Sequence, residues 1–159
     1  MKNIVFMPAI RDRRRLGRSE GYRWSVKSWK NWCNKNNAEL FLLQDALVDP
    51  QEMSVAWQRY NVFKLLENSE VKYKQILMID ADTIVHPDCP NFFEETDGKY
   101  CGVAETGCYE WVSRSIKKYK EEFWPQTTIN PWSYFNGGFQ IVNETHKELR
   151  DDYETLKTD

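Results

Sequence analysis

The chain has 159 residues, of which 41% are hydrophobic and 14% aromatic, so it can bury one substantial core, and its length favours a single domain over residues 1–159. The formal charge of −2, from 22 basic and 24 acidic residues, excludes a whole-protein field that would attract nucleic acid or acidic membranes. Four irregularly spaced cysteines with no CxxC pair are not typical of a disulfide scaffold or a zinc site.

The amino-terminal residues predict a strand, a basic loop, a helix and a second strand. Asn3–Met7 is a short apolar run that Pro8 ends, and the basic loop follows at Arg11–Arg18. Glu39–Leu43 predicts the second strand. The helix is predicted by apolar residues at helical spacing, Tyr22, Val26, Trp29 and Cys33. Because the first apolar run lacks a cleavage site, and no run approaches the roughly 20 residues that span a bilayer, we expect a cytoplasmic protein without a signal peptide or membrane span.

A second helix is predicted to begin at Asp49. Asp49 can serve as the N-cap, Pro50 suits the first helical position, and Glu52 can reach back to the cap. Apolar residues then recur along one side with the 3.6-residue period of a helix: Met53, Ala56, Trp57, Tyr60, Phe63 and Leu66. One helix is therefore expected from Asp49 to Leu66.

The later elements complete an α/β pattern. Ile76–Ile79 is apolar without alternation, which predicts a strand covered on both faces, as in a parallel sheet between helices. Further strands are predicted at Tyr100–Glu105 and at Tyr134–Asn143, where Gly137-Gly138 interrupts the second one. The helix between them is predicted by Ile116, Tyr119 and Phe123. A capping box at Thr145–Glu148 predicts a last helix. Its buried face would carry Leu149, Tyr153 and Leu156.

Two aspartates, Asp80 and Asp82, follow the buried strand Ile76–Ile79 at its carboxyl end, where open α/β sheets bind their ligands. In an extended segment their side chains point to the same side, with α-carbons about 6.6 Å apart. Hard oxygen ligands favour Mg²⁺ or Mn²⁺, and two carboxylates leave positions open for phosphate oxygens and water. The alternative is that these aspartates only cap a turn.

The sequence around these aspartates, ILMIDADTIVHPD, closely resembles the strand and Asp-x-Asp element of GT-A fold glycosyltransferases, especially glycogenin-like nucleotide-sugar enzymes. A second stretch, YFNGGFQIVN at Tyr134–Asn143, looks like the Asn-Gly strand of the same group, and the two motifs occur in the same order. The resemblance implies a Rossmann-like GT-A domain with a mixed, mainly parallel sheet flanked by helices. It also implies transfer of a sugar from a nucleotide-diphosphate donor, with UDP as the expected nucleotide.

The resemblance also implies roles for residues of the two motifs. Asp80 and Asp82 would bind the Mn²⁺ or Mg²⁺ that bridges the donor diphosphate, and the backbone of Ala81 would lie near the ribose. Asn136 and the pair Gly137 and Gly138 would face the donor sugar. A glycine pair in a strand permits close approach of a ligand to the backbone, although it can also mark a simple bulge.

Other residues are implied less directly. The end of the first strand would lie under the nucleotide base: Pro8, Ala9, Ile10 and Arg11. A basic residue before the Asp-x-Asp, either Arg59 or Lys64, would lie near the diphosphate or the sugar, although each could instead be solvated. Glu105 could contact the acceptor or act as a base, or have a structural role. Three tryptophans flank the Asn-Gly element and could stack on sugar rings or belong to the core: Trp111, Trp124 and Trp132.

The sequence departs from the glycogenin-like pattern in one respect. Those enzymes usually complete the metal site with a histidine in an HxxGxxKPW-like segment, which these 159 residues lack. Water could replace that ligand, the chain could belong to another GT-A subgroup, or it could be part of a longer protein. The acceptor, whether a glycan, a protein or a small molecule, is not predicted.

Two other functions are compatible with an Asp-x-Asp. A haloacid-dehalogenase-like phosphatase would use one aspartate as nucleophile, but it normally has threonine or valine where Ile84 stands. A non-catalytic module would bind a nucleotide sugar and a metal without turnover.

Overall fold

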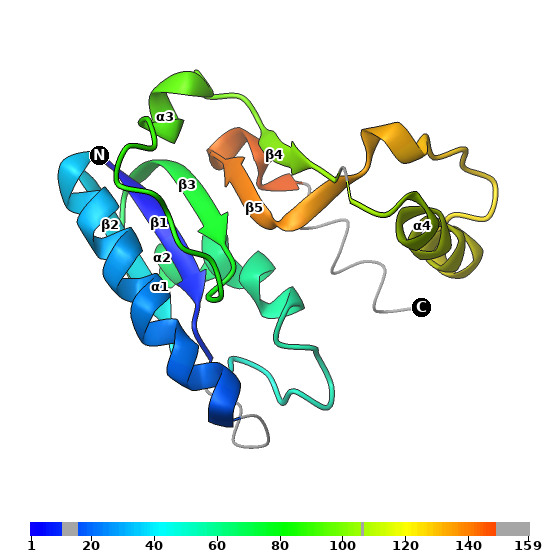
Figure 1. Ribbon diagram of the computed structural model, residues 1–159, viewed down its shortest axis with the longest axis horizontal. Coiled ribbons are helices and arrows are strands. Elements are labelled where there is room, and N and C mark those ends of the chain that lie inside the picture. The colour runs from blue at the N-terminus through cyan, green and yellow to red at the C-terminus, as the bar shows by residue number, and fades with distance from the viewer. Residues whose placement is uncertain (11–15, 106, 149–159) are drawn as a thin grey trace.

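The computed structural model describes residues 1–10, 16–105 and 107–148 (Figure 1). The strands are β1 (Lys2–Pro8), β2 (Ala38–Leu43), β3 (Tyr73–Ile79), β4 (Cys101–Ala104) and β5 (Phe135–Val142). The helices are α1 (Leu16–Lys35), α2 (Val62–Asn68), α3 (Phe92–Glu95) and α4 (Tyr109–Phe123). Short 3₁₀ turns are η1 (Trp57–Asn61), η2 (Pro131–Ser133) and η3 (Glu144–His146). Every strand predicted within the described residues is present.

The described strands form one five-stranded sheet in the order β2-β1-β3-β5-β4. β1 runs parallel to both β2 and β3, whereas β5 lies antiparallel between β3 and β4. The predicted α/β class is therefore confirmed, and the sheet is mixed. Since β3 and β5 are antiparallel, the carboxyl end of β3 meets the beginning of β5.

Both faces of the central strands are buried. Successive strand residues point to opposite faces, so β1 sends Val5 to one hydrophobic cluster and Phe6 to another. The cluster on the side of α1 includes Trp29 and Trp32, and the cluster on the side of α2 includes Leu66. These two layers explain why the β1 and β3 sequences are apolar without alternation.

The continuous helix predicted from Asp49 to Leu66 is wrong in its first half. Asp49 caps a single turn, with Oδ1 accepting from the N–H of Gln51 at 2.8 Å and its carbonyl accepting from the N–H of Met53 at 2.9 Å, but this turn is not continued, and η1 and α2 follow later. The buried side chain of Gln58 explains the difference. Its Nε2 donates hydrogen bonds to the carbonyls of Val48, at 2.9 Å, and Met53, at 3.2 Å. This amide binds carbonyls of the preceding segment, so a contact from Gln58 holds the chain as a loop after the single turn that Asp49 caps.

The capping box predicted at Thr145–Glu148 is also displaced. Asn143 is the N-cap of η3: its Oδ1 accepts from the N–H of Thr145 at 2.9 Å, and His146 Nδ1 accepts from the N–H of Asn143 at 3.0 Å. The residues predicted for the last helix, 149–156, lie outside the described part of the chain. Within the described part, no helix combines the length and apolar character needed to cross a membrane.

Candidate functional site

The two sequence motifs meet at one edge of the sheet. Ile79, the last residue of β3, pairs with Phe139 of β5. One residue beyond that pair, the N–H of Asp80 donates to the carbonyl of Gly138 at 2.9 Å. The Asp-x-Asp turn and the Asn-Gly strand, which are more than fifty positions apart in the sequence, are therefore in direct contact.

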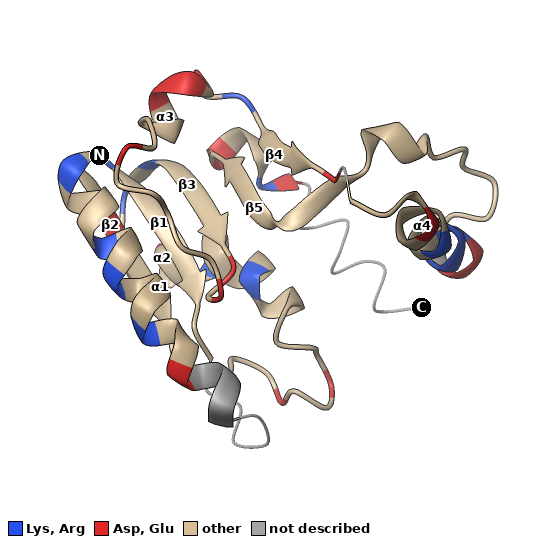
Figure 2. Ribbon diagram, viewed as in Figure 1, with Lys and Arg blue, Asp and Glu red and all other residues tan. Residues whose placement is uncertain are grey.

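Arg59 of η1 connects both motifs. Its Nη2 binds Asp80 Oδ1, its Nη1 donates to the carbonyl of Gly137, and its Nε donates to the carbonyl of Ala56 at 2.7 Å. A buried guanidinium requires acceptors for its fixed set of N–H groups, and this arrangement supplies three. Figure 2 shows the basic segment of η1 beside the acidic turn that follows β3. The other basic candidate, Lys64, is exposed on α2.

Gly138 permits the close approach of Asp80. A Cβ atom built on Gly138 would overlap Asp80 Oδ2 and lie 2.9 Å from Asn136 Oδ1, closer than real Cβ atoms come. A Cβ on Gly137 would meet only Gln140 Nε2, at an ordinary 3.5 Å. The pairing of β4 with β5 also shifts register between Gln140 and Asn136, so the bulge expected at a strand glycine is present too.

Asn136 links the glycine pair to Glu105. Asn136 Oδ1 accepts from the N–H of Gly138 at 2.6 Å, and its Nδ2 donates to Glu105 Oε2 at 3.2 Å. The other carboxylate oxygen, Glu105 Oε1, accepts from the N–H of Gly107 at 3.0 Å. Both oxygens of Glu105 are thus oriented, and the chain of contacts runs from Glu105 through Asn136 and Gly138 to Asp80.

The segment from Asp80 to Asp82 is not extended, so that prediction is wrong. β3 ends at Ile79, and the chain turns: the N–H and the Oγ1 of Thr83 donate to the Asp80 carbonyl at 3.3 and 2.7 Å. Trp29 Nε1 in turn donates to Thr83 Oγ1 at 3.0 Å. The threonine hydroxyl closes this turn on the backbone of Asp80, while the Asp80 carboxylate points to Arg59. The turn leaves Asp82 exposed.

The residues expected under the nucleotide lie at the same edge, because β1 and β3 are parallel and end side by side. Pro8, Ala9 and Ile10 are buried, as is Ala81, and Ala9 and Ala81 belong to the same hydrophobic cluster. These buried residues belong to the core next to this edge of the sheet. Arg11 lies outside the described residues. The nucleotide role of these positions stays a prediction.

Asp80 and Asp82 are the two carboxylates that the sequence assigned to a Mg²⁺ or Mn²⁺ ion, and this role stays a prediction. The described residues contain no group of three or more histidine, cysteine, aspartate or glutamate side chains that could hold a metal ion. Asp80 and Asp82 offer hard carboxylate oxygens, although Arg59 already binds Oδ1 of Asp80. Mg²⁺ often binds through one or two carboxylates together with substrate phosphates and water, so two aspartates are a sufficient protein contribution.

A buried polar network behind Arg59 was not predicted from the sequence. Gln140 Nε2 donates to the Gly137 carbonyl at 3.0 Å and to the Tyr60 hydroxyl at 3.3 Å, while its Oε1 accepts from the Tyr100 hydroxyl at 3.0 Å. Burial, and secondarily Tyr60, raise the pKa of Tyr100 to about 12. The available signal was the glutamine itself, a polar residue inside the apolar strand β5.

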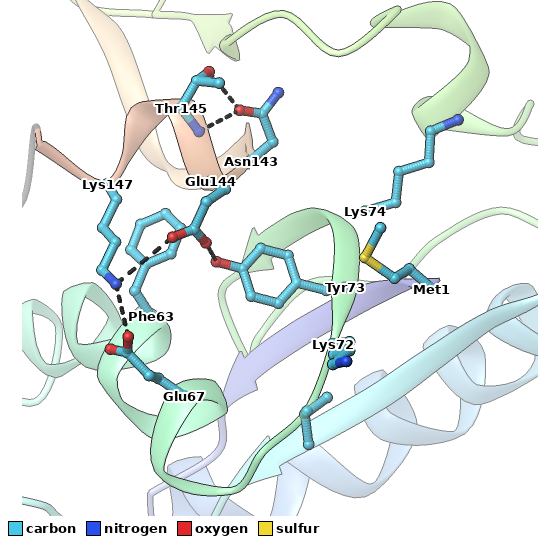
Figure 3. Close-up of a pocket in the computed structure, with 11 residues that line it drawn as sticks. Met1, Phe63, Glu67, Lys72, Tyr73, Lys74, Asn143, Glu144, Thr145 and Lys147 are labelled. Carbon is cyan, nitrogen blue, oxygen red and sulfur yellow. Dashed lines mark hydrogen bonds and ion pairs between the residues drawn. The ribbon is translucent and has the colours of Figure 1, made fainter.

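A cavity of about 550 Å³ lies elsewhere, at the beginning of β3 (Figure 3). Lys147 pairs across it with Glu67, at 3.0 Å, and with Glu144, at 3.6 Å, and the Tyr73 hydroxyl also binds Glu144. β3 separates this cavity from Asp80 by about 20 Å. The cavity is lined by none of the predicted site residues among the described positions, so we place the candidate site at the edge of the sheet around Asp80 instead.

Comparisons with known proteins identify the fold. No protein-family model matches the chain, and no curated protein matches it in sequence. Among solved structures, it is similar to the crystal structure of a glycosyltransferase involved in the glycosylation of the major capsid of PBCV-1, with a TM-score of 0.65. This chain has the fold of that glycosyltransferase. The similarity covers 99% of this chain and 67% of the other, at 11% sequence identity.

Proposed function

We propose that this chain is a metal-dependent glycosyltransferase domain of the GT-A type, which transfers a sugar from a nucleotide-diphosphate donor, with UDP as the expected nucleotide. The observation that carries this proposal is the contact between Asp80 and Gly138, because it joins the predicted cation site to the predicted donor-sugar site. The fold shared with a glycosyltransferase supports it independently.

The described residues suggest a division of roles. Asp80 and Asp82 would hold Mn²⁺ or Mg²⁺, and such an ion, when bound, would offset the negative charge of the donor diphosphate. Arg59 fixes the Asp80 carboxylate by binding Oδ1 and also holds the Gly137 carbonyl, so it presets the relation between the two halves of the site. Asn136, held by Glu105, would position the donor sugar.

The phosphatase alternative fits these contacts less well. A nucleophilic aspartate needs an accessible oxygen with room for an incoming phosphoryl group. Asp80 Oδ1 is engaged by Arg59, and Oδ2 lies against Gly138, where a Cβ atom would overlap it. Asp80 is therefore held as a fixed acceptor of the Arg59 guanidinium, which does not suit an attacking nucleophile.

The experiment that tests the proposal is a binding and turnover panel. UDP-glucose, UDP-galactose, UDP-N-acetylglucosamine and GDP-mannose are each titrated calorimetrically with and without MnCl₂, and release of UDP or GDP is then followed over hours. Metal-dependent binding of at least one donor with slow release of its nucleotide supports a transferase. Binding without release supports the non-catalytic module, and release of phosphate from small phosphoesters supports the phosphatase.

A further inference from the structure

Exposed aromatic side chains gather on the segment that joins β4 to β5. Trp132 is 81% exposed and Tyr109 is 59% exposed, and Trp111 and Trp124 of this segment are also exposed, as is Phe135, the first residue of β5. In Figure 1 this segment, with α4 and η2, extends beyond the edge of the sheet, away from α1. Contiguous exposed apolar surface rimmed by polar residues marks ligand-binding sites.

The rings are held in defined arrangements. Tyr109 and Trp132 lie with centroids 5.6 Å apart at an interplanar angle of 31°, and Trp111 contacts Tyr134 edge-on at 5.9 Å. The backbone of η2 is fixed as well, because the N–H of Trp132 donates to Asn130 Oδ1 at 3.1 Å. These aromatic faces are therefore preset, which lowers the entropy cost of stacking a ligand on them.

This aromatic surface is continuous with the candidate site. The N–H of Glu105 donates to the carbonyl of Tyr134 at 3.1 Å, and the Glu105 carboxylate accepts from Asn136. Trp132 precedes Asn136 by four positions, so at most about 13 Å of extended chain separates their α-carbons. A molecule on these rings would reach the residues proposed to face the donor sugar.

We propose that the rings of Tyr109 and Trp132 form an acceptor subsite for carbohydrate. This inference rests on the proposed function, because a sugar bound beside the donor site is an acceptor only when the donor's sugar is transferred to it. A sugar ring presents a flat face of C–H groups edged by hydroxyls. Tryptophan and tyrosine rings combine an apolar face with a polar group that can stay in contact with water, and so suit such a ligand. Glu105 and Asn136 supply hydrogen-bonding groups at the end nearest the donor.

A protein partner fits this surface less well. The core of a protein interface is depleted of charged residues. Here the intervening helix α4 carries exposed ion pairs, Arg114 with Glu110 at 3.6 Å and Lys117 with Glu121 at 3.8 Å. The aromatic rings therefore lie beside a solvated charged face, which suits isolated sugar rings better than one continuous apolar interface.

The test uses a glycan array of neutral oligosaccharides, followed by calorimetry with the best-bound probes. The variants are Trp132→Ala and Tyr109→Ala, and the matched control is Trp24→Ala, an exposed tryptophan on α1 (56%) with Arg23 over its ring. We expect Trp132→Ala to weaken oligosaccharide binding about tenfold, the equivalent of one stacking contact, and Trp24→Ala to leave it unchanged.

Three outcomes would overturn the inference: no array probe binds the parent protein, Trp132→Ala binds as the parent does, or the parent self-associates and Trp132→Ala dissociates it. Thermal unfolding of each variant reports that it is folded. Donor titration on the same preparations separates the two proposals. A parent protein that binds the donor but no oligosaccharide contradicts only the subsite, whereas a parent protein that binds oligosaccharide but no donor contradicts only the transferase.

Discussion

Arg59 and Asp80 form an ion pair with unequal burial: the side chain of Arg59 is 7% exposed and that of Asp80 is 39% exposed. The two partners therefore depend on each other to different degrees. Asp80 can be hydrated if Arg59 is removed, whereas Arg59 without Asp80 is a buried charge with weaker acceptors.

This asymmetry predicts the order of two substitutions. Asp80→Asn should lower the free energy of unfolding by about 2 kcal/mol, because it leaves the buried guanidinium without its counter-charge. Arg59→Met, which keeps the length of the stem and leaves a partly hydrated carboxylate, should cost about 1 kcal/mol. Urea unfolding at pH 7 measures both. A larger cost for Arg59→Met would show that the arginine is not the dependent partner.

Gly138→Ala should disturb the site directly. The added methyl group would occupy the position of Asp80 Oδ2, so the carboxylate or the strand must move, at a cost of about 1–3 kcal/mol. The matched control is Gly137→Ala, whose Cβ makes only an ordinary contact. Chemical unfolding and metal-dependent donor binding should both respond to Gly138→Ala, and equal effects of the two substitutions would refute the close packing of Asp80 on Gly138.

Tyr100→Phe should change the stability at neutral and alkaline pH differently. At pH 8 it removes the donor to Gln140 Oε1, which should cost about 1–2 kcal/mol. The pKa of Tyr100 is raised from 10.0 to about 12 in the folded protein, so the unfolded chain ionises first as pH rises. Tyr100 therefore contributes a loss of stability between about pH 10 and 12 that the variant lacks. Unfolding measured from pH 8 to 12 should show a shallower decline for Tyr100→Phe, and parallel declines would contradict this assignment.

Glu105→Gln tests the positioning of Asn136. The substitution replaces one carboxylate oxygen with an N–H₂ group, so one of the two donors from Asn136 and Gly107 loses its acceptor. We expect the affinity for a UDP-sugar to fall about fivefold, the equivalent of one hydrogen bond, while the affinity for UDP alone is unchanged. Calorimetry with both ligands makes the comparison, and an equal loss for both would place Glu105 at the nucleotide instead.

Sequence patterns that depend on a single strand predicted the structure well. The apolar runs of β1 and β3 could be placed from sequence because burial on both faces leaves them no polar positions. The resemblance of the two motifs placed Asp80 and Asn136 at related positions. The glycine pair was singled out as a place of close approach to a ligand; in the structure Asp80 packs closely against Gly138, and the role of the pair toward a donor sugar stays a prediction.

Contacts between distant elements could not be predicted. The capping residues at Asp49 indicated a helix, but Gln58 satisfies the loop backbone instead, and nothing in the local sequence marks that preference. Arg59 and Lys64 were equivalent in sequence, and only the packing of η1 against Gly137 distinguishes them. The exposure of Trp132 likewise follows from the path of the chain between β4 and β5.

The most direct test of the metal-dependent donor site is calorimetric titration of the best-bound nucleotide sugar into the parent protein, Asp82→Asn and Asp88→Asn, each with and without MnCl₂. Asp88 is an exposed aspartate six positions farther along and serves as the matched control. The proposed site predicts Mn²⁺-dependent binding to the parent and to Asp88→Asn, and at least a tenfold loss in Asp82→Asn, with thermal unfolding of each variant as the check that it is folded. Binding that is independent of Mn²⁺, or equal in Asp82→Asn and the parent, would contradict it.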